Sequence, residues 1–157
     1  MKEVVSFFLS GKEYGVDISR VQGIENYVEM SAGAQGLDFL LGLVNIRDEI
    51  IPVVNIKKCL VLPPAGVTEE TKYLVFPTSH GTLACVVDGV SKIFKADGDD
   101  VQNFPPLMQT KTTGYAEYVV RNEEGNLLVI VNPENLLKEE EWSAIREMLS
   151  KMEENND

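Results

Sequence analysis

The chain is dominated by a succession of short apolar or alternating segments, each closed by residues that favour turns. About nine or ten such segments follow one another at spacings of roughly eight to twelve residues, which is typical of β-barrels and sandwiches rather than of alternating strands and helices. Several segments are apolar at every position, so they must be covered on both faces. The predicted strands are 4–9, 13–18, 24–30, 41–46, 50–56, 73–76, 83–87, 91–95, 115–120 and 127–131. The fold class that follows is all-β with short helices.

Single residues predict where the first segments begin and end. Asp17 is placed to cap a short helix over 18–22, which Gly23 would end because glycine readily adopts the left-handed backbone conformation. Pro52 has no N–H to donate to a β-ladder, so it predicts an edge position or a bulge for the strand over 50–56. These residues set the expected boundaries in the first third of the chain.

The C-terminal part departs from the β pattern. Asn132 followed by Pro133 gives an N-cap and a favoured first helical residue. We predict a further helix over 139–152, because apolar residues recur there at helical spacing. These apolar residues are Trp142, Ile145, Leu149 and Met152. We interpret this stripe as a face docked on the β-structure, with a partner-binding face as the alternative.

Length and punctuation together indicate one domain. The 157 residues suffice for one unit with a hydrophobic core of its own. The Pro63-Pro64-Ala65-Gly66 run is the best internal break, so we place a boundary between two subdomains near 62–70. We expect a single domain over 1–152, followed by a polar tail over 153–157.

Composition argues against several function classes. Asp and Glu number 25 against 14 Lys and Arg, which leaves a net charge of −11. This sign disfavours binding to nucleic acid or to anionic lipid. No stretch approaches the ~18–20 apolar residues of a membrane-spanning helix, and the first residues lack the apolar core of a secretory signal. We therefore expect a cytoplasmic protein with no nucleic-acid partner and no membrane insertion.

Candidate reactive residues are few. Cys59 and Cys85 have no nearby Cys or His partner, so both are interpreted as small buried hydrophobes rather than as disulfide or metal-site residues. His80, the single histidine, lies between two apolar runs and is interpreted as a turn residue. The sequence has no phosphate-binding glycine loop, dinucleotide motif or zinc-protease motif. We expect no enzyme activity, no metal and no cofactor.

Four blocks of the sequence keep an order that is found in one known family. The blocks are Glu13-Tyr14-Gly15-Val16-Asp17-Ile18 with Val21-Gln22-Gly23-Ile24, Gly42-Leu43-Val44-Asn45-Ile46-Arg47 with Ile50-Ile51-Pro52-Val53-Val54-Asn55-Ile56, Val86-Val87-Asp88-Gly89-Val90, and Leu128-Val129-Ile130-Val131-Asn132 with Leu136-Leu137. Together they cover nearly the whole chain. In this combination the sequence resembles the CheW-like chemotaxis adaptors, a family of coupling proteins.

The resemblance implies a fold and a function. The fold would be two five-stranded SH3-like β-barrels that share an apolar core, with a C-terminal helix. CheW-like adaptors are non-catalytic scaffolds that couple chemoreceptors to a CheA-type histidine kinase in bacterial chemotaxis arrays. The implied partners are therefore the cytoplasmic tip of a methyl-accepting chemoreceptor and the regulatory domain of the kinase. A cytoplasmic chain of this kind would be recruited to membrane-anchored receptor arrays.

The resemblance also implies contact residues. In the family the receptor tip docks between the barrels, near the first helix and the Asn-Leu-Arg-Gly segment. Carried over to this sequence, the receptor-binding residues are Val21, Gln22, Ile24, Asn45, Ile46 and Arg47. The alternative is that Val21 and Ile24 are core residues and that Arg47 is a solvated turn. The kinase-binding residues carried over are Pro105 and Leu107, with an ordinary loop anchor as the alternative for Leu107.

Three positions depart from the family pattern. Gly23 stands where the family usually has Glu, Asp48 where it usually has Gly, and Asn55 where it usually has Asp. Asp48 is the most pointed departure, because a turn glycine often supplies a positive φ that aspartate tolerates less readily. Asp48 also sets a carboxylate beside Arg47, where we expect it to compete with a partner for the guanidinium.

Two other readings stay open at this stage. The first is that the chain is a CheW-like coupling protein of a histidine kinase pathway that does not control flagella. The second is an unrelated β-barrel module that binds a ligand or a peptide strand at an exposed edge, which Pro52 suggests. A pull-down from cell lysate separates these readings. The identity of the kinase that is recovered decides whether the pathway controls flagella, and recovery of any histidine kinase argues against the second reading.

Overall fold

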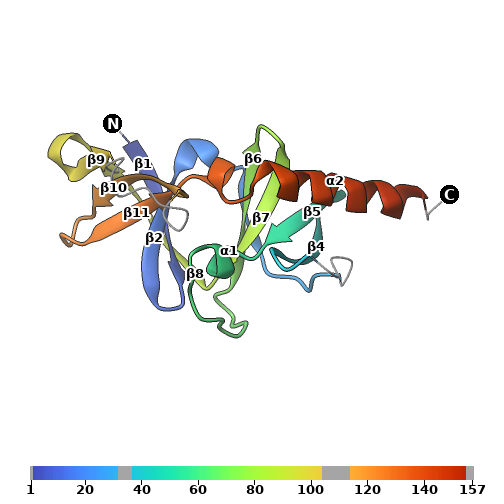
Figure 1. Cartoon of the computed structure of the whole chain (residues 1–157). Helices are drawn as coiled ribbons and strands as arrows, with labels where there is room; N and C mark the ends of the chain where they lie inside the picture. Colours follow the sequence, from blue (N-terminus) through green and yellow to red (C-terminus); the bar gives the residue numbers. More distant parts are fainter. Residues whose placement is uncertain (1, 32–36, 104–113, 155–157) are drawn as a thin grey trace.

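The computed structural model describes residues 2–31, 37–103 and 114–154, and β-strands dominate it (Figure 1). The strands are β1 Lys2–Leu9, β2 Lys12–Asp17, β3 Gly23–Asn26, β4 Leu40–Ile46, β5 Glu49–Val54, β6 Lys72–Thr78, β7 Gly81–Val87, β8 Gly89–Ala96, β9 Val101–Asn103, β10 Ala116–Arg121 and β11 Leu127–Val131. The α-helices are α1 Ile56–Cys59 and α2 Glu139–Glu154, and the 3-10 turns are η1 Ile18–Arg20, η2 Gly98–Asp100 and η4 Pro133–Asn135. The predicted class, all-β with short helices, is confirmed.

The strands form two sheets, which occupy opposite halves of the molecule in Figure 1. The six-stranded sheet has the order β8-β1-β2-β11-β10-β9, and the five-stranded sheet has the order β3-β6-β7-β5-β4. We call them the first and the second barrel. The first has one strand more than predicted, because the three-residue β9 adds to β10. A segment that short carries no recognisable alternation.

Each barrel takes strands from both halves of the chain, which corrects the expected boundary near 62–70. In the first barrel, β1 pairs with β8, and β2 pairs with the C-terminal β11. The chain passes from the second barrel to the first through Asp88 alone, between β7 and β8. The 62–70 segment instead joins α1 to β6 within the second barrel. Local composition marks this loop, but it does not contain the long-range pairing that defines the barrels.

A short bridge closes the second barrel, whose edge strands are β3 and β4. Ser31 follows β3 and donates its N–H to the Leu43 carbonyl of β4 at 2.8 Å, and the Leu43 N–H donates back at 3.4 Å. A Cβ at Gly42 would lie 2.8 Å from the Ser31 carbonyl oxygen, so this close approach requires glycine. The bridge also explains why β3 ends at Asn26 rather than at the predicted residue 30: the chain leaves β6 there and crosses to β4.

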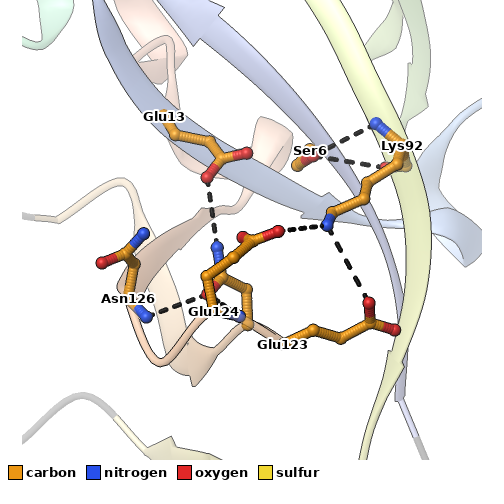
Figure 2. Close-up of polar contacts among 7 residues, drawn as sticks. Ser6, Glu13, Lys92, Glu123, Glu124 and Asn126 are labelled. Carbon is orange, nitrogen blue, oxygen red and sulfur yellow. Dashed lines mark hydrogen bonds and ion pairs between the residues drawn. The ribbon is translucent and has the colours of Figure 1, made fainter.

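Polar contacts join β8 of the first barrel to the β10–β11 turn (Figure 2). Lys92 of β8 donates its Nζ–H to Glu124 Oε1 at 2.8 Å, and this contact raises the pKa of Lys92. The backbone N–H and C=O of Lys92 both meet the Ser6 hydroxyl of β1 at 3.3 Å. Asn122 donates its Nδ2–H to Glu13 Oε1 of β2 at 3.3 Å. The turn is therefore tied to strands on both sides of the barrel.

The described part of the chain forms three apolar clusters, one inside each barrel and one between them. The first-barrel cluster comprises Val4, Phe94, Ala96, Tyr118, Val120, Leu128 and Ile130. The second-barrel cluster comprises Val44, Ile51, Val53, Tyr73, Val75 and Ala84. The third, which we call the shared core, comprises Val5, Phe7, Leu9, Tyr14, Val16, Leu40, Val54, Ile56, Leu60, Leu74, Phe76, Leu83, Cys85, Val87, Val131, Leu136, Leu137, Trp142 and Ile145. The predicted sharing of an apolar core by two barrels is confirmed.

The helix α2 contributes to the shared core. Trp142 and Ile145 are 3% and 1% exposed, and Leu149 packs half-buried against the same cluster. The Trp142 ring lies 5.8 Å from the His80 ring, measured between centroids. His80 belongs to the β6–β7 turn, as predicted. The interpretation of the stripe as a docked face is confirmed for these residues, and Met152 is also half-buried.

Charged and polar side chains reinforce the contact between the barrels. Ser79 of the β6–β7 turn donates its N–H and its hydroxyl to the Glu134 carboxylate of η4, each at 2.8 Å. Asp88 accepts from the Ser10 N–H of the β1–β2 turn at 2.6 Å and from Lys57 Nζ of α1 at 2.8 Å. Because each set links an element of one barrel to an element beside the other, the barrels are held in a fixed arrangement.

The predicted helix over 18–22 is wrong in length. Only the 3-10 turn Ile18–Arg20 forms, although Asp17 caps it as predicted by accepting the Ser19 N–H at 3.1 Å. The chain is already extended when it reaches Gly23, because the Gln22 N–H donates to the Val75 carbonyl of β6 at 2.8 Å. Gly23 therefore begins β3 instead of ending a helix.

Of the two alternatives predicted for Pro52, the edge position is wrong, whereas the β4–β5 ladder does shift register close to it, between Leu40 and Gly42. Pro52 lies in β5, which runs between β4 and β7 in the second barrel. Pairing of β5 with β7 begins only at Val53, so the missing N–H of Pro52 falls before that ladder starts. The sequence argument for an exposed edge at this strand is thereby removed.

Because the shared core takes side chains from both barrels, we expect the protein to unfold in one cooperative transition. Differential scanning calorimetry of the full chain should give equal calorimetric and van't Hoff enthalpies. Two well-separated transitions would show that each barrel is stable by itself.

The substitution Trp142→Ala should lower the free energy of unfolding by ~3–5 kcal/mol, the cost typical of removing a large buried aromatic side chain. A urea titration measures this change. Ser150→Ala, at an exposed position of the same helix, serves as the control and should stay within about 0.5 kcal/mol. A loss below about 1 kcal/mol for Trp142→Ala would contradict the role of α2 in the shared core.

Candidate functional site

The turn between β4 and β5 has an unusual backbone conformation. Arg47 and Asp48 have φ angles of 54° and 67°, and Ile46 pairs with Glu49 across the turn. Positive φ at both central residues defines a type I′ hairpin turn, whose twist matches that of the flanking strands. Asn45 supports the turn, because its Oδ1 accepts the Asp48 N–H at 3.1 Å. Arg47 is therefore projected from a well-defined point at the end of the second barrel.

The Arg47 side chain extends into solvent but is held at one point. It is 84% exposed, and its Nε–H donates to Glu25 Oε1 of β3 at 3.1 Å. The Glu25 side chain is only 25% exposed. Within the described residues the guanidinium forms no ion pair with Asp48, so the expected competition from the Asp48 carboxylate is wrong. The neighbouring strand supplies the acid instead.

An exposed apolar side chain accompanies this ion pair. Ile50 of β5 is 52% exposed. Ile24 of β3 is 41% exposed, but its side chain faces the opposite side of the strand from that of Glu25. Ile50 pairs directly with Asn45 across the hairpin, which places it next to the turn. We call Glu25, Asn45, Arg47 and Ile50 the Arg47 surface. Apolar groups beside a guanidinium with free N–H donors suit recognition of a protein surface.

The remaining residues of the predicted receptor set serve the fold as well as the surface. Val21 is half-buried and packs against the shared core, and Ile46 packs half-buried against the second-barrel cluster. The side chain of Gln22 is exposed, while its backbone N–H is bonded to β6. The alternative reading of Val21 as a core residue thus holds in part. Arg47 and Ile24, by contrast, are open to a partner.

Pro105 and Leu107 lie outside the described residues. Their predicted contact with a kinase therefore remains a prediction.

Comparison with known proteins identifies the family. The model of the CheW-like domain family matches residues 3–141. The chain belongs to this family. Chemotaxis protein CheW of Klebsiella aerogenes is 28% identical over 144 residues, which is 92% of this chain and 86% of that protein. Chemotaxis protein CheW of Bacillus subtilis is 25% identical over 145 residues, which is 92% of each.

A solved structure of the CheW-like family shows the same fold. The crystal structure of the scaffolding protein TtCheW from Thermoanaerobacter tengcongensis superposes with a TM-score of 0.77. The match covers 87% of this chain and 88% of that chain, at 23% sequence identity. This likeness supports the arrangement of the two barrels.

Two of the three departures from the CheW-like pattern have a simple structural account. Asn55 is the N-cap of α1, and its Oδ1 accepts the Lys58 N–H at 3.3 Å. Because asparagine and aspartate cap helices about equally well, this departure is conservative. Asp48 occupies a positive-φ position where glycine is favoured, and aspartate is among the residues that tolerate it.

Sequence reasoning missed Glu25 and Ile50 as members of the Arg47 surface. Ile50 was accessible to inference, because a two-residue turn at Arg47 and Asp48 places it opposite Asn45. No local signal marks Glu25, since its contact with Arg47 depends on the closure of β3 against β4. Contacts of this kind follow from the barrel and not from spacing along the chain.

An apolar groove of about 740 Å³ lies elsewhere on the second barrel, lined in part by Tyr27, Met30, Leu41, Ile56 and Val61. Its charged side chains are already engaged: Lys57 pairs with Asp88, and Lys58 pairs with Asp38. These pairs leave the charges of the groove compensated within the protein.

The two thiols behave largely as predicted. Cys85 is fully buried in the shared core, and Cys59 is half-buried beside it. Burial raises the pKa of both thiols above the ordinary value. Among the described residues, no group of three or more His, Cys, Asp or Glu side chains is arranged to hold a metal ion. No helix in that same part of the chain combines the length and apolarity needed to span a membrane.

The substitution Asp48→Gly should raise the free energy of unfolding by about 0.5–1 kcal/mol, because glycine adopts a positive φ without steric cost. Denaturant titration measures the change. Glu49→Gly, one residue later in β5, is the matched control and should instead destabilise by a similar amount. Equal effects of the two substitutions would contradict the special conformation of the turn.

Proposed function

We propose that this chain is a non-catalytic scaffold that couples chemoreceptors to a CheA-type histidine kinase in a bacterial chemotaxis array. The proposal rests mainly on the match of residues 3–141 to the CheW-like domain family. It is supported by the relatives named chemotaxis protein CheW and by the fold shared with a protein described as a scaffold. The function is one of binding two proteins at once.

The cytoplasmic tip of a methyl-accepting chemoreceptor is the proposed partner of the Arg47 surface. The proposed contacts are Val21, Gln22, Ile24, Asn45, Ile46 and Arg47. The exposed guanidinium provides hydrogen-bond donors for carbonyl or carboxylate groups, and Ile24 provides apolar contact area. A mixed surface of this kind suits an amphipathic helical hairpin.

The regulatory domain of the kinase is the proposed second partner, through the segment that contains Pro105 and Leu107. Binding to receptors would recruit the chain from the cytoplasm to the membrane-anchored array. No cofactor, metal or nucleic acid enters this proposal.

Reconstitution tests the function as a whole. Receptor-bearing membranes, a CheA-type kinase and this chain should sediment together, and the kinase should be lost from the pellet when the chain is omitted. Autophosphorylation of the kinase should then respond to receptor ligand only in the presence of the chain. Failure of the kinase to sediment with receptors and chain would contradict the proposed coupling.

The substitution Arg47→Glu should weaken binding to a receptor-tip peptide hairpin at least tenfold, equivalent to ~1.4 kcal/mol. The reason is that it replaces donors by a carboxylate and sets that carboxylate beside Glu25. Isothermal titration calorimetry measures the affinity, and urea titration should show a stability change within about 1 kcal/mol.

Lys95→Glu is the matched control for Arg47→Glu, because it makes the same change of charge at an exposed position of the first barrel. Its affinity for the receptor tip should stay within about twofold of the unmodified chain. Equal affinity in the Arg47→Glu chain and the unmodified chain would remove Arg47 from the receptor site.

A further inference from the structure

Within the described residues, the chain passes between the two sheets twice, at opposite ends of the β1–β2 hairpin. The first crossing is residues 18–22, between β2 and β3, and the second is Asp88, between β7 and β8. The first crossing begins after Asp17, which pairs with Val4 at the open end of the hairpin. Asp88 lies near the turn end, because its N–H donates to the Phe8 carbonyl at 2.9 Å. At ~3.3 Å per residue of strand, the crossings are about 17 Å apart along β2.

The first crossing is held to β10 of the first barrel by a bidentate ion pair. Arg20, the last residue of η1, donates its Nε–H to Glu117 Oε2 at 2.9 Å and its Nη2–H to Glu117 Oε1 at 2.7 Å. Two parallel hydrogen bonds of this kind fix direction as well as distance. The Tyr118 hydroxyl donates to Oδ2 of Asp17, the N-cap of η1, at 2.8 Å. The turn η1 is therefore bonded to β10 at both of its ends.

A β-bulge allows neighbouring residues of β10 to reach the same turn. In a regular strand, adjacent side chains point to opposite faces. The ladder between β10 and β11 shifts register between Ala116 and Tyr118, which leaves Glu117 as the extra residue. A bulge redirects a side chain, so Glu117 can meet Arg20 while the Tyr118 hydroxyl meets Asp17. The irregularity of β10 thus serves its contact with the first crossing.

The other side of the first crossing is bonded to the second barrel. Only Val21 lies between Arg20 and Gln22, whose N–H donates to the Val75 carbonyl of β6 at 2.8 Å. The side chain of Val21 packs against the shared core. The first crossing is therefore a single residue with fixed neighbours on both sides.

Apolar burial joins the barrels, but it does not by itself fix their relative orientation. The hydrophobic effect is non-directional, so two packed surfaces can shift slightly while they keep the same area buried. Hydrogen bonds and bidentate ion pairs are directional. At the second crossing, the Asp88 carboxylate accepts from Lys57 Nζ at 2.8 Å and from the Ser10 N–H at 2.6 Å. Directional contacts at two separated points therefore restrict rotation of one barrel against the other.

We propose that the Arg20–Glu117 and Lys57–Asp88 ion pairs, one at each crossing, fix the orientation of the two barrels and allow the chain to transmit the state of a receptor to the kinase. The fixed orientation needs no partner. Its role in transmission rests on the proposed function. A displacement of one barrel by a partner reaches a protein bound to the other barrel only if the angle between the barrels is held.

The Arg20–Glu117 pair is the better of the two to test. Its side chains are 30% and 24% exposed, whereas those of Lys57 and Asp88 are 14% and 21% exposed. Removing one partner of the more buried pair would leave a charge with less access to water, and this would perturb the fold more strongly. Substitutions at Arg20 and Glu117 therefore change the orientation with the least disturbance of the barrels.

Residual dipolar couplings of the backbone N–H groups measure the orientation directly. One alignment tensor should fit both barrels of the unmodified chain, because a rigid molecule aligns as one body. Arg20→Met and Glu117→Gln should each require a separate tensor for each barrel, with unequal degrees of order. Urea titration should show that both variants remain folded, since the shared core is unchanged. A single tensor for both barrels in each of these variants would overturn the proposal.

Lys58→Met is the matched control, because it removes an ion pair with Asp38 that lies wholly in the part of the chain that builds the second barrel. It should retain a single tensor. The double variant Arg20→Met with Glu117→Gln should resemble either single variant, because each substitution removes the same contact. A difference between the tensors that grows additively in the double variant would contradict the assignment to this pair.

Reconstitution with receptor-bearing membranes and a CheA-type kinase tests transmission. With Glu117→Gln the kinase should still sediment with the receptors, but the change in its autophosphorylation on addition of receptor ligand should fall about threefold or more. A full response to ligand in this variant would overturn the role in transmission. Failure of the unmodified chain to bring the kinase to the receptors would overturn the proposed function, and the dipolar couplings, which need no partner, distinguish that failure from loss of the fixed orientation.

Discussion

Burial of one apolar cluster between the barrels is the interaction on which the rest of the molecule depends. Among the residues that the structure describes, the cluster inside the first barrel has seven buried residues and that inside the second has six, whereas the shared core has nineteen. Clusters of this size give each barrel little apolar burial of its own with which to offset the entropy cost of ordering its chain. The shared core supplies the missing burial, and it takes Trp142 and Ile145 of α2 to complete it. The position of the Arg47 surface thus depends on the shared core, to which both barrels and α2 contribute side chains.

Some residues of the family signature are needed for packing, and others are exposed to solvent. Gly15 belongs to the first block, and a Cβ there would lie 2.6 Å from Ile130 Cδ1 and 2.7 Å from Val4 Cγ1. Gly42 of the second block is required by the close approach of Ser31. These glycines are needed for packing, while Arg47 of the same block extends into solvent. A signature of this type therefore combines residues that build the barrels with residues that face a partner.

Local patterns predicted most of the strands, because alternation and turn residues act over a few positions. The cap at Asp17 and the helix stripe at Trp142 were both visible in this way. The assignment of strands to barrels was not, since the pairing of β1 with β8 joins segments far apart in the chain. The same limit hid Glu25, whose role depends on the seam between β3 and β4. Sequence reasoning thus identified Arg47 but not the acid that pairs with it.

The passage of the chain through Asp88 has a mechanical consequence. No linker separates β7 from β8, and Asp88 is fixed by the Ser10 N–H and by Lys57. A linker of several residues would act as a swivel, whereas one residue bonded on both sides leaves little freedom of rotation. A push applied at one barrel is therefore carried to the other as a displacement of a stiff body. In a scaffold that binds two proteins, such stiffness means that a displacement of one partner is transmitted to the other, instead of being absorbed by a flexible connection.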